Sequence, residues 1–266
     1  MMKKTTFTMT PLSIGAVRIY DLNGIRLHAY ETKNPFADEC YLFETGQELI
    51  GLEAPLFRDN LAEFADHIQS LNKPLNHLIL AYHPGGGNAF AGSRVYTTEA
   101  AKKSMGEGGF IKAMIDNFAG IFGDKLYTEI PAVTDTIKAG KVTIGGIEFI
   151  VTDTPESFDL EIPAINVVYT HMVGHRVHNI LESPEHIDAM IEQMEDYEKR
   201  KPSLILTTHD VPVTAEIAAE KISYLQKVKE LAAKSKDQAS FIAGVKAAFP
   251  DYAGEKYLEM SAEVLF

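Results

Sequence analysis

One histidine stands where an apolar strand changes into a glycine-rich turn. The segment runs from His77 through Leu-Ile-Leu-Ala-Tyr to His83, and Pro-Gly-Gly-Gly-Asn follows directly. A short apolar strand that ends in a polar, flexible loop presents side chains at the rim of a sheet, a common location for binding and catalytic groups. Many hydrolases hold a metal cluster at such a turn. This one carries one histidine and no carboxylate, so we expect an active-site scaffold that lacks much of the usual chemistry.

A second histidine follows a later strand in the same way. Ser203–Thr207 predicts a short buried strand, and the polar run 208–210, which contains His209, comes at its end. Tyr82 and Tyr169 also lie at predicted strand ends. Their hydroxyls could donate a hydrogen bond to a ligand, although tyrosine commonly borders sheets as half-buried packing.

Three further histidines have a spacing that would suit a helix. His171, His175 and His178 would share one helical face. However, Val167–Thr170 predicts a strand directly before them, and Gly174 interrupts the run. We therefore expect His175 and His178 to be polar loop residues or contacts to neighbouring segments.

Other catalytic chemistry finds little support. The glycines at 85–87 are not part of a nucleotide-binding motif, so a close-packing turn is the better interpretation. Ser157 lacks the Gly-x-Ser-x-Gly context that exposes a nucleophile. Cys40 lies within a predicted strand with no histidine nearby in the sequence. Neither residue is expected to act as a nucleophile.

These residues are positioned by strands in the first part of the chain and by helices in the last third. Asn23-Gly24, the run 45–47 and Gly145-Gly146 predict tight turns between strands. Expected strands are 16–20, 25–30, 40–44, 48–52, the strand ending at Ala81, 94–97, 142–144, 147–152, 165–170 and 203–207. Expected helices are 59–71, a helix capped by Thr97 or Thr98, 109–122, 184–199 capped by Ser183, 214–234 and 238–249. Without repeats or linkers, we expect a single domain over 1–266 with a helical C-terminal extension at about 213–266.

Composition excludes several classes of function. The 266 residues carry a net charge of −12, which would repel a phosphate backbone, and there is no run of Lys or Arg, so nucleic acid is not an expected partner. No apolar run is long enough to span a bilayer, and the charged N-terminus is not followed by the apolar stretch of a secretory signal. Cys40 is the single cysteine and cannot form an internal disulfide. We therefore expect a cytoplasmic protein with no membrane-embedded role.

An apolar stripe in the predicted helix 109–122 leaves the oligomeric state open. The stripe consists of Phe110, Ile111, Met114, Ile115 and Phe118. It could include surplus apolar area for a homodimer, but a stripe of this kind is more often core.

The order of these segments resembles the signature blocks of the metallo-β-lactamase superfamily over about residues 40–210. The blocks are 41–55 (Tyr-Leu-Phe-Glu-Thr-Gly-Gln-Glu-Leu-Ile-Gly-Leu-Glu-Ala-Pro), 77–90, 94–100 (Arg-Val-Tyr-Thr-Thr-Glu-Ala), 153–157 (Asp-Thr-Pro-Glu-Ser), 165–171 (Ile-Asn-Val-Val-Tyr-Thr-His) and 204–209 (Leu-Ile-Leu-Thr-Thr-His). The resemblance implies an αββα sandwich, in which two mixed sheets lie face to face with helices outside. It also implies one or two metal ions, usually zinc or iron, that activate water for hydrolysis at the sheet edge.

The ligand pattern departs from that of the family. The family's loop normally reads His-x-His-x-Asp-His, whereas residues 82–87 read Tyr-His-Pro-Gly-Gly-Gly, so its four ligands have no counterparts in register. Asp153 stands where the family has the histidine of a His-Thr-Pro-Gly-Ser block, and His171 displaces the usual bridging aspartate. His209 matches the family's last ligand, and Glu53 takes the place of an acidic residue that usually supports the site.

A centre with one metal ion is compatible with the remaining residues, although a two-metal site is not expected. The implied fold brings together the strand ends that carry four candidate ligands. These are His83, Asp153, His171 and His209. Three imidazoles and a carboxylate suit Zn or Fe, with Glu53 or Asp210 orienting the ligands. The alternative is that these are rim residues, solvated or hydrogen-bonded without a metal.

Two functions follow from these alternatives. In the first, the protein has lost the dinuclear metal centre and acts as a small-molecule binding or non-hydrolytic module. In the second, it is a mononuclear metal-dependent hydrolase of a small ester or lactone. Its cleft would be lined by Tyr82, His83, His171 and His209.

Overall fold

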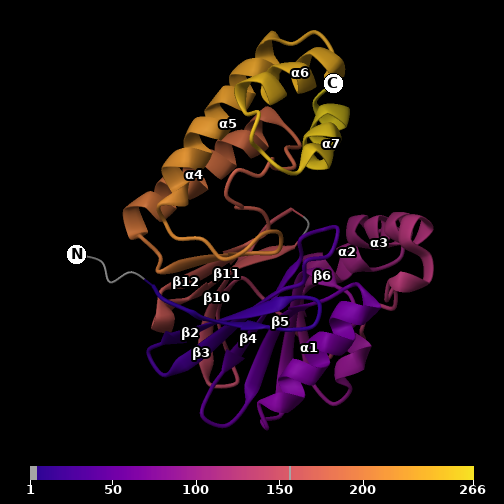
Figure 1. The fold of residues 1–266 in the computed structure, drawn as a ribbon, viewed down its shortest axis with the longest axis vertical. Helices are drawn as coiled ribbons and strands as arrows, with labels where there is room; N and C mark the ends of the chain where they lie inside the picture. Colours follow the sequence, from indigo (N-terminus) through magenta and orange to yellow (C-terminus); the bar gives the residue numbers. More distant parts are fainter. Residues whose placement is uncertain (1–4, 156) are drawn as a thin grey trace. The chain divides into compact units, whose positions relative to one another are not determined.

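The computed structural model describes residues 5–155 and 157–266, and the chain divides into two compact units. Unit 1 comprises Met1–His171 together with Thr207–Val211, and unit 2 comprises Met172–Leu206 together with Pro212–Phe266. Figure 1 shows that the strands of unit 1 and the helices of unit 2 follow one another along the chain. The single domain over 1–266 with a helical C-terminal extension at about 213–266 stays a prediction.

An eight-stranded sheet in unit 1 has its strands in sequence order. They are β1 (Thr8–Pro11), β2 (Ala16–Leu22), β3 (Ile25–Glu31), β4 (Glu39–Glu44), β5 (Leu49–Ala54), β6 (Leu75–Pro84), β7 (Arg94–Thr98) and β8 (Asp135–Ile137). Neighbours from β1 to β5 are antiparallel, and those from β5 to β8 are parallel. Asn23 and Gly24 join β2 to β3 with φ angles of 48° and 86°, as the predicted two-residue hairpin turn requires.

A second, antiparallel set of strands in unit 1 faces the first sheet. It contains β9 (Gly140–Ile144), β10 (Ile147–Asp153), β11 (Phe158–Ile162) and β12 (Val167–Thr170), paired in that order. Aromatic rings bridge the two layers: Phe43 of β4 lies 5.8 Å from Phe149 of β10, and Tyr41 lies 6.4 Å from Tyr169. Alternate residues of each strand supply this shared core, because side chains alternate between the two faces of a strand.

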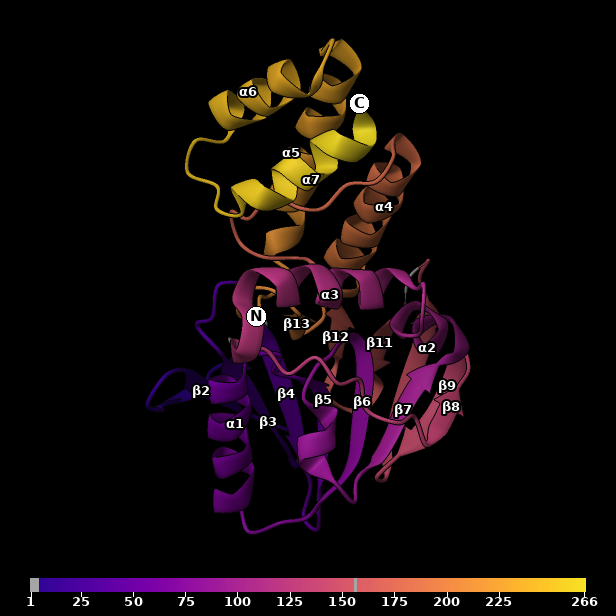
Figure 2. The same cartoon turned by 90° about the vertical axis from the view of Figure 1, so that its right-hand side faces the viewer.

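Helix α1 (Arg58–Ser70) covers the other face of the eight-stranded sheet (Figure 2). Its Phe64 and Ile68 pack against Val17, Leu42 and Leu49 from three strands. Unit 1 also contains α2 (Glu99–Met105), α3 (Phe110–Phe122) and short 3-10 turns at Gly87–Phe90, Gly123–Lys125 and Pro163–Ile165. Two facing sheets and helices make this a mixed α/β fold, as the sequence predicted.

The apolar stripe of α3 is divided between buried and exposed positions. Ile111 and Ile115 are buried, and Phe118 packs beside the cluster formed by Leu56, Phe57 and Leu126, whereas Phe110 is 51% exposed. Much of the stripe therefore belongs to the core, and association into a homodimer stays a prediction.

Unit 2 consists mainly of four helices around a core of its own. They are α4 (Pro184–Arg200), α5 (Ile217–Lys234), α6 (Gln238–Ala248) and α7 (Glu255–Leu265). The predicted cap of α4 is present, since Ser183 Oγ accepts a hydrogen bond from His186 N at 3.1 Å. Strand β13 (Leu204–Thr207) ends where the short segment 207–211 of unit 1 begins. No helix in the described part of the chain combines the length and apolar character needed to cross a membrane.

Candidate metal centre

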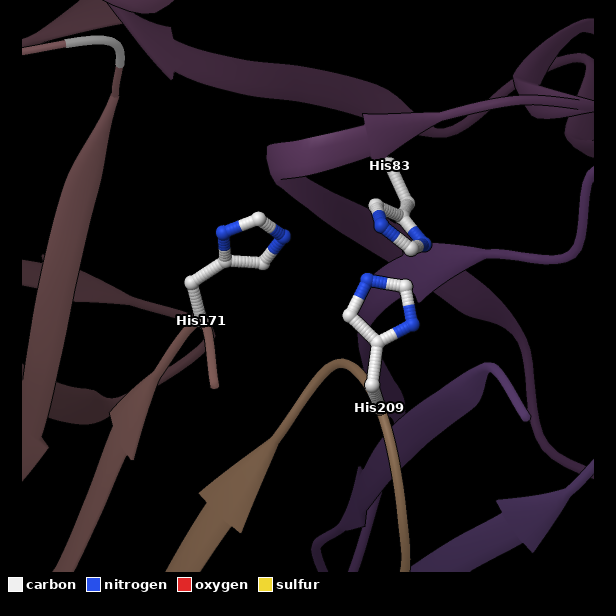
Figure 3. Close-up of side chains that lie close together, drawn as sticks. All are labelled: His83, His171 and His209. Atoms are coloured by element: carbon white, nitrogen blue, oxygen red, sulfur yellow. The ribbon is translucent and has the colours of Figure 1, made fainter. Parts of the chain in front are cut away.

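Three histidines from distant parts of the sequence meet in unit 1. His83 lies near the end of β6, His171 directly follows β12, and His209 lies two residues after β13. Figure 3 shows their imidazoles pointing toward one another. Each offers a ring nitrogen, and these three atoms lie within 4.8 Å of one another. The parallel β5–β6 pair and the segment after β13 thus bring three of the four predicted ligands together.

A buried carboxylate fixes the end of the strand that carries His83. Glu53 is fully buried and has a φ of 61°. Its two oxygens accept hydrogen bonds from the backbone N–H groups of Ala81, Tyr82 and His83, at 3.3, 2.7 and 3.0 Å. The hydroxyl of Tyr169 donates to the same carboxylate. Glu53 therefore contacts the end of β6 through backbone N–H groups, and a role in supporting metal ligands stays a prediction.

A second buried carboxylate, Asp38, lies against two of the histidines. Its Oδ1 is 3.3 Å from Nδ1 of His83 and 3.6 Å from Nδ1 of His209. The Phe36 carbonyl oxygen lies 2.9 Å from the same His209 nitrogen, and Asn34 Nδ2 donates to Asp38 Oδ2 at 3.0 Å. With oxygen acceptors at Nδ1, each neutral imidazole keeps its hydrogen there and its lone pair at Nε2. Histidine metal ligands are commonly oriented in this way.

Sequence reasoning missed Asp38 because it considered the carboxyl ends of strands. Asp38 precedes β4, which runs antiparallel to β5, so the start of β4 lies at the same edge as the end of β5. The start of β4 and the residues just before it also pair with the residues after β13. Glu39 N donates to the Thr208 carbonyl at 2.9 Å, and Asp210 N donates to the Ala37 carbonyl at 3.0 Å. Asn34 and Asp38 in one loop were a weak signal that could have drawn attention to this edge.

The charges in the cluster are coupled through Asp38. Burial lowers the pKa of His83, but the charge and hydrogen bond of Asp38 outweigh it and leave that pKa raised. Burial and the charge of His83 lower the pKa of His209 to about 4. Burial raises the pKa of Asp38, but His83 and His209 together bring it below its usual value. At neutral pH Asp38 is therefore an anion and His209 is neutral.

His171 is held through its backbone and its ring. Its carbonyl oxygen accepts hydrogen bonds from Thr207 Oγ1 at 2.9 Å, Thr208 Oγ1 at 2.6 Å and Thr208 N at 3.0 Å. Its imidazole stacks on the ring of Tyr82, and the Tyr82 hydroxyl lies 2.8 Å from Thr154 Oγ1. These contacts join the end of β12 to the segment that carries His209.

The remaining predicted site residues lie outside this group. Asp153 is exposed at the end of β10 and does not join the three histidines. Asp210 follows His209 with a φ of 80°, and its carboxylate accepts a hydrogen bond from Val211 N at 2.8 Å. Asp210 therefore helps to shape the turn that follows His209.

His175 and His178 take part in separate polar contacts within unit 2. His175 Nδ1 lies 2.8 Å from a carboxylate oxygen of Glu220, and its side chain is 58% exposed. His178 is buried and its Nδ1 lies 3.0 Å from the Tyr224 hydroxyl. The expectation that these two residues contact neighbouring segments is confirmed.

The donor set fits one metal ion. A catalytic zinc commonly has three protein ligands and one position left for water or substrate, and three close imidazoles match that number. Within the described residues, the group that could hold a metal consists of His83, His171 and His209. Two bridged ions would need more donors than these three provide.

Solved structures of metallo-β-lactamase proteins are similar to this chain. A metallo-β-lactamase family protein from Thermus thermophilus aligns with a TM-score of 0.63 and 13% identity over 92% of both chains. A β-lactamase domain protein from Burkholderia ambifaria has a TM-score of 0.61 and 16% identity, over 93% of this chain and 87% of that one. An archaeal metallo-β-lactamase superfamily protein from Sulfolobus tokodaii has a TM-score of 0.55 and 14% identity, over 87% of this chain and 97% of that one.

These likenesses show that the chain has the metallo-β-lactamase fold, which confirms the fold implied by the sequence blocks. No protein-family model matches the sequence, and no curated protein sequence matches it.

Proposed function

We propose that this protein is a hydrolase that uses a single zinc or iron ion held by His83, His171 and His209. The observation that carries the proposal is the meeting of three imidazole nitrogens within 4.8 Å. Oxygen acceptors at Nδ1 of two of these rings add support, because they favour Nε2 as the ligand atom. When bound, the ion supplies a Lewis acid and a water molecule of lowered pKa.

The protein's own groups would orient the ligands. Asp38 and the Phe36 carbonyl hold the rings of His83 and His209. Glu53 keeps the end of β6 in place through three backbone N–H groups. A small uncharged ester or lactone is the proposed substrate class, because the net charge of −12 disfavours an anionic one.

A metal-free small-molecule binding module is the second candidate. The observation in its favour is the contact between His83 and Asp38, since an imidazolium paired with a buried carboxylate satisfies both groups without a metal. In that case the three rings would offer hydrogen bonds and apolar faces to an organic ligand.

Metal content separates the two candidates. Protein loaded with Zn or Fe and then desalted should hold about one equivalent by elemental analysis. His209→Ala should lower the bound metal strongly, whereas His175→Ala, an exposed histidine of unit 2, should leave it unchanged. Less than about a tenth of an equivalent in the unaltered protein would favour the binding module. Hydrolysis of a panel of aryl esters and lactones, lost on chelation and restored by Zn, tests the activity itself.

A further inference from the structure

The imidazole of His171 lies flat against the phenol ring of Tyr82. Their centroids are 4.3 Å apart, and the planes differ by 2°. The other ring pairs in the cluster are steeply inclined: 80° for His83 and His171, 66° for His83 and His209, and 50° for His171 and His209. Tyr82 therefore covers one face of a proposed ligand, and the other histidines approach that ligand from different directions.

Tyr82 itself is held at both ends. Its backbone N–H donates to Glu53 at 2.7 Å, and its hydroxyl lies 2.8 Å from Thr154 Oγ1 and 3.4 Å from Asp159 Oδ1. The residue is 7% exposed. Burial and the backbone hydrogen bond to Glu53 keep the phenol ring against the imidazole, and the hydroxyl contacts add to this restraint.

We propose that Tyr82 is a positioning residue that fixes the plane of the His171 imidazole, an inference that rests on the proposed metal-dependent function. His83 and His209 are oriented by oxygen atoms at Nδ1. Stacking on Tyr82 provides the corresponding restraint for His171, because rotation of the imidazole about its Cβ–Cγ bond would drive its edge into the phenol ring. An imidazole polarised by a cation is electron-poor, and the electron-rich face of tyrosine attracts such a ring. The stack should therefore favour the ligand-bound geometry.

Equilibrium zinc binding in competition with a chromogenic chelator tests this role. Tyr82→Leu removes the stacked face, and we expect it to raise the Kd for zinc by roughly 10- to 100-fold, as the loss of an outer orienting group does elsewhere. Tyr82→Phe keeps the ring and should change the Kd by less than about threefold. The visible spectrum of the Co(II)-loaded protein should change with Tyr82→Leu and stay as in the unaltered protein with Tyr82→Phe.

A matched control is Tyr96→Leu. Tyr96 is also 7% exposed, and its hydroxyl lies 2.9 Å from Nδ1 of His77, a histidine outside the cluster. Its loss should lower stability to a comparable extent and leave zinc binding unchanged. If Tyr82→Leu fails to fold by circular dichroism, Tyr82→Met replaces it, because methionine keeps apolar volume without an aromatic face.

The NMR signals of ring-labelled histidines in the zinc-free protein decide the positioning role independently of metal. Tyr82 should shift the His171 ring signals upfield, and Tyr82→Leu should abolish this shift. Unchanged His171 signals together with unchanged zinc affinity would overturn the inference. Absence of zinc binding in the unaltered protein would overturn the proposed function instead, and the NMR result would then decide the positioning role alone.

Discussion

Asp38 Oδ1 lies 3.3 Å from Nδ1 of His83, so that a buried anion and a proposed metal ligand are in direct contact. The same oxygen is 3.6 Å from Nδ1 of His209. One carboxylate thus orients two of the three imidazoles, a relationship that gives the cluster a common support outside the ligands themselves.

Removing the charge of Asp38 should weaken metal binding. In Asp38→Asn the side chain keeps its size but loses its negative charge, so Nδ1–H of His83 loses its anionic acceptor. We expect the zinc Kd to rise by roughly 10- to 100-fold, measured by chelator competition. Asp251→Asn, at an exposed position, is the control. A zinc affinity equal to that of the control would mean that Asp38 does not support the ligands.

Asp153→Asn tests whether Asp153 is a metal ligand. The sequence predicts that it is, whereas the group of possible ligands in the structure contains the three histidines. Asp153 is exposed at the end of β10 and outside the histidine group. We expect its substitution to leave the zinc stoichiometry near one equivalent and the Kd within about threefold of the original value. A large loss of bound zinc in elemental analysis would show that the carboxylate joins the ligands after all.

Glu53→Gln should destabilise unit 1. The carboxylate accepts hydrogen bonds from three backbone N–H groups and from the Tyr169 hydroxyl. In the glutamine variant, an NH₂ group replaces one carboxylate oxygen and faces those donors. Burying unsatisfied donors costs about 1–3 kcal/mol, to be measured as a loss of unfolding free energy in urea. Glu148→Gln, in an exposed ion pair with Lys141, should change this free energy by less than about 0.5 kcal/mol.

The strands of the first sheet were largely predictable from local pattern. β2 to β5 lie within two residues of their expected bounds, because alternation and an Asn-Gly turn are local signals. β11 was not predicted, although Phe158, Leu160 and Ile162 are buried and alternate with more exposed acidic residues. This alternation is a local signal from which the strand could be predicted. β8 has three residues, too few for a periodic signal.

The site was predictable only in part, since its members come together through topology. His83 lies near the end of a strand, and His171 and His209 follow strands, a placement that the local sequence pattern indicates. Asp38 lies before an antiparallel strand, and its place at the same edge depends on pairing that the sequence does not display. The stacking of Tyr82 on His171 depends on side-chain packing between distant segments, which no local pattern reveals.

A buried histidine pair should make unit 1 sensitive to acid. His28 Nδ1 lies 3.1 Å from His67 Nε2, and His28 Nε2 lies 2.9 Å from Glu44, which also contacts Lys73 and Arg26. Burial, and next the charge of His28, lower the pKa of His67 to about 4, and burial lowers that of His28. The unfolded chain therefore binds more protons than the folded one between about pH 6.5 and pH 4.

The contribution of this pair to the unfolding free energy should thus have its full value above about pH 6.5 and should fall as the pH decreases toward 4. His67→Gln can still donate a hydrogen bond to His28 but takes up no proton. We expect this variant to have a smaller slope of unfolding free energy against pH, by an amount that corresponds to the uptake of up to about one proton. The slope is measured by urea unfolding at a series of pH values. His175→Gln, at an exposed position in unit 2, should keep the original slope. An equal slope in both variants would show that the buried pair does not set the acid sensitivity.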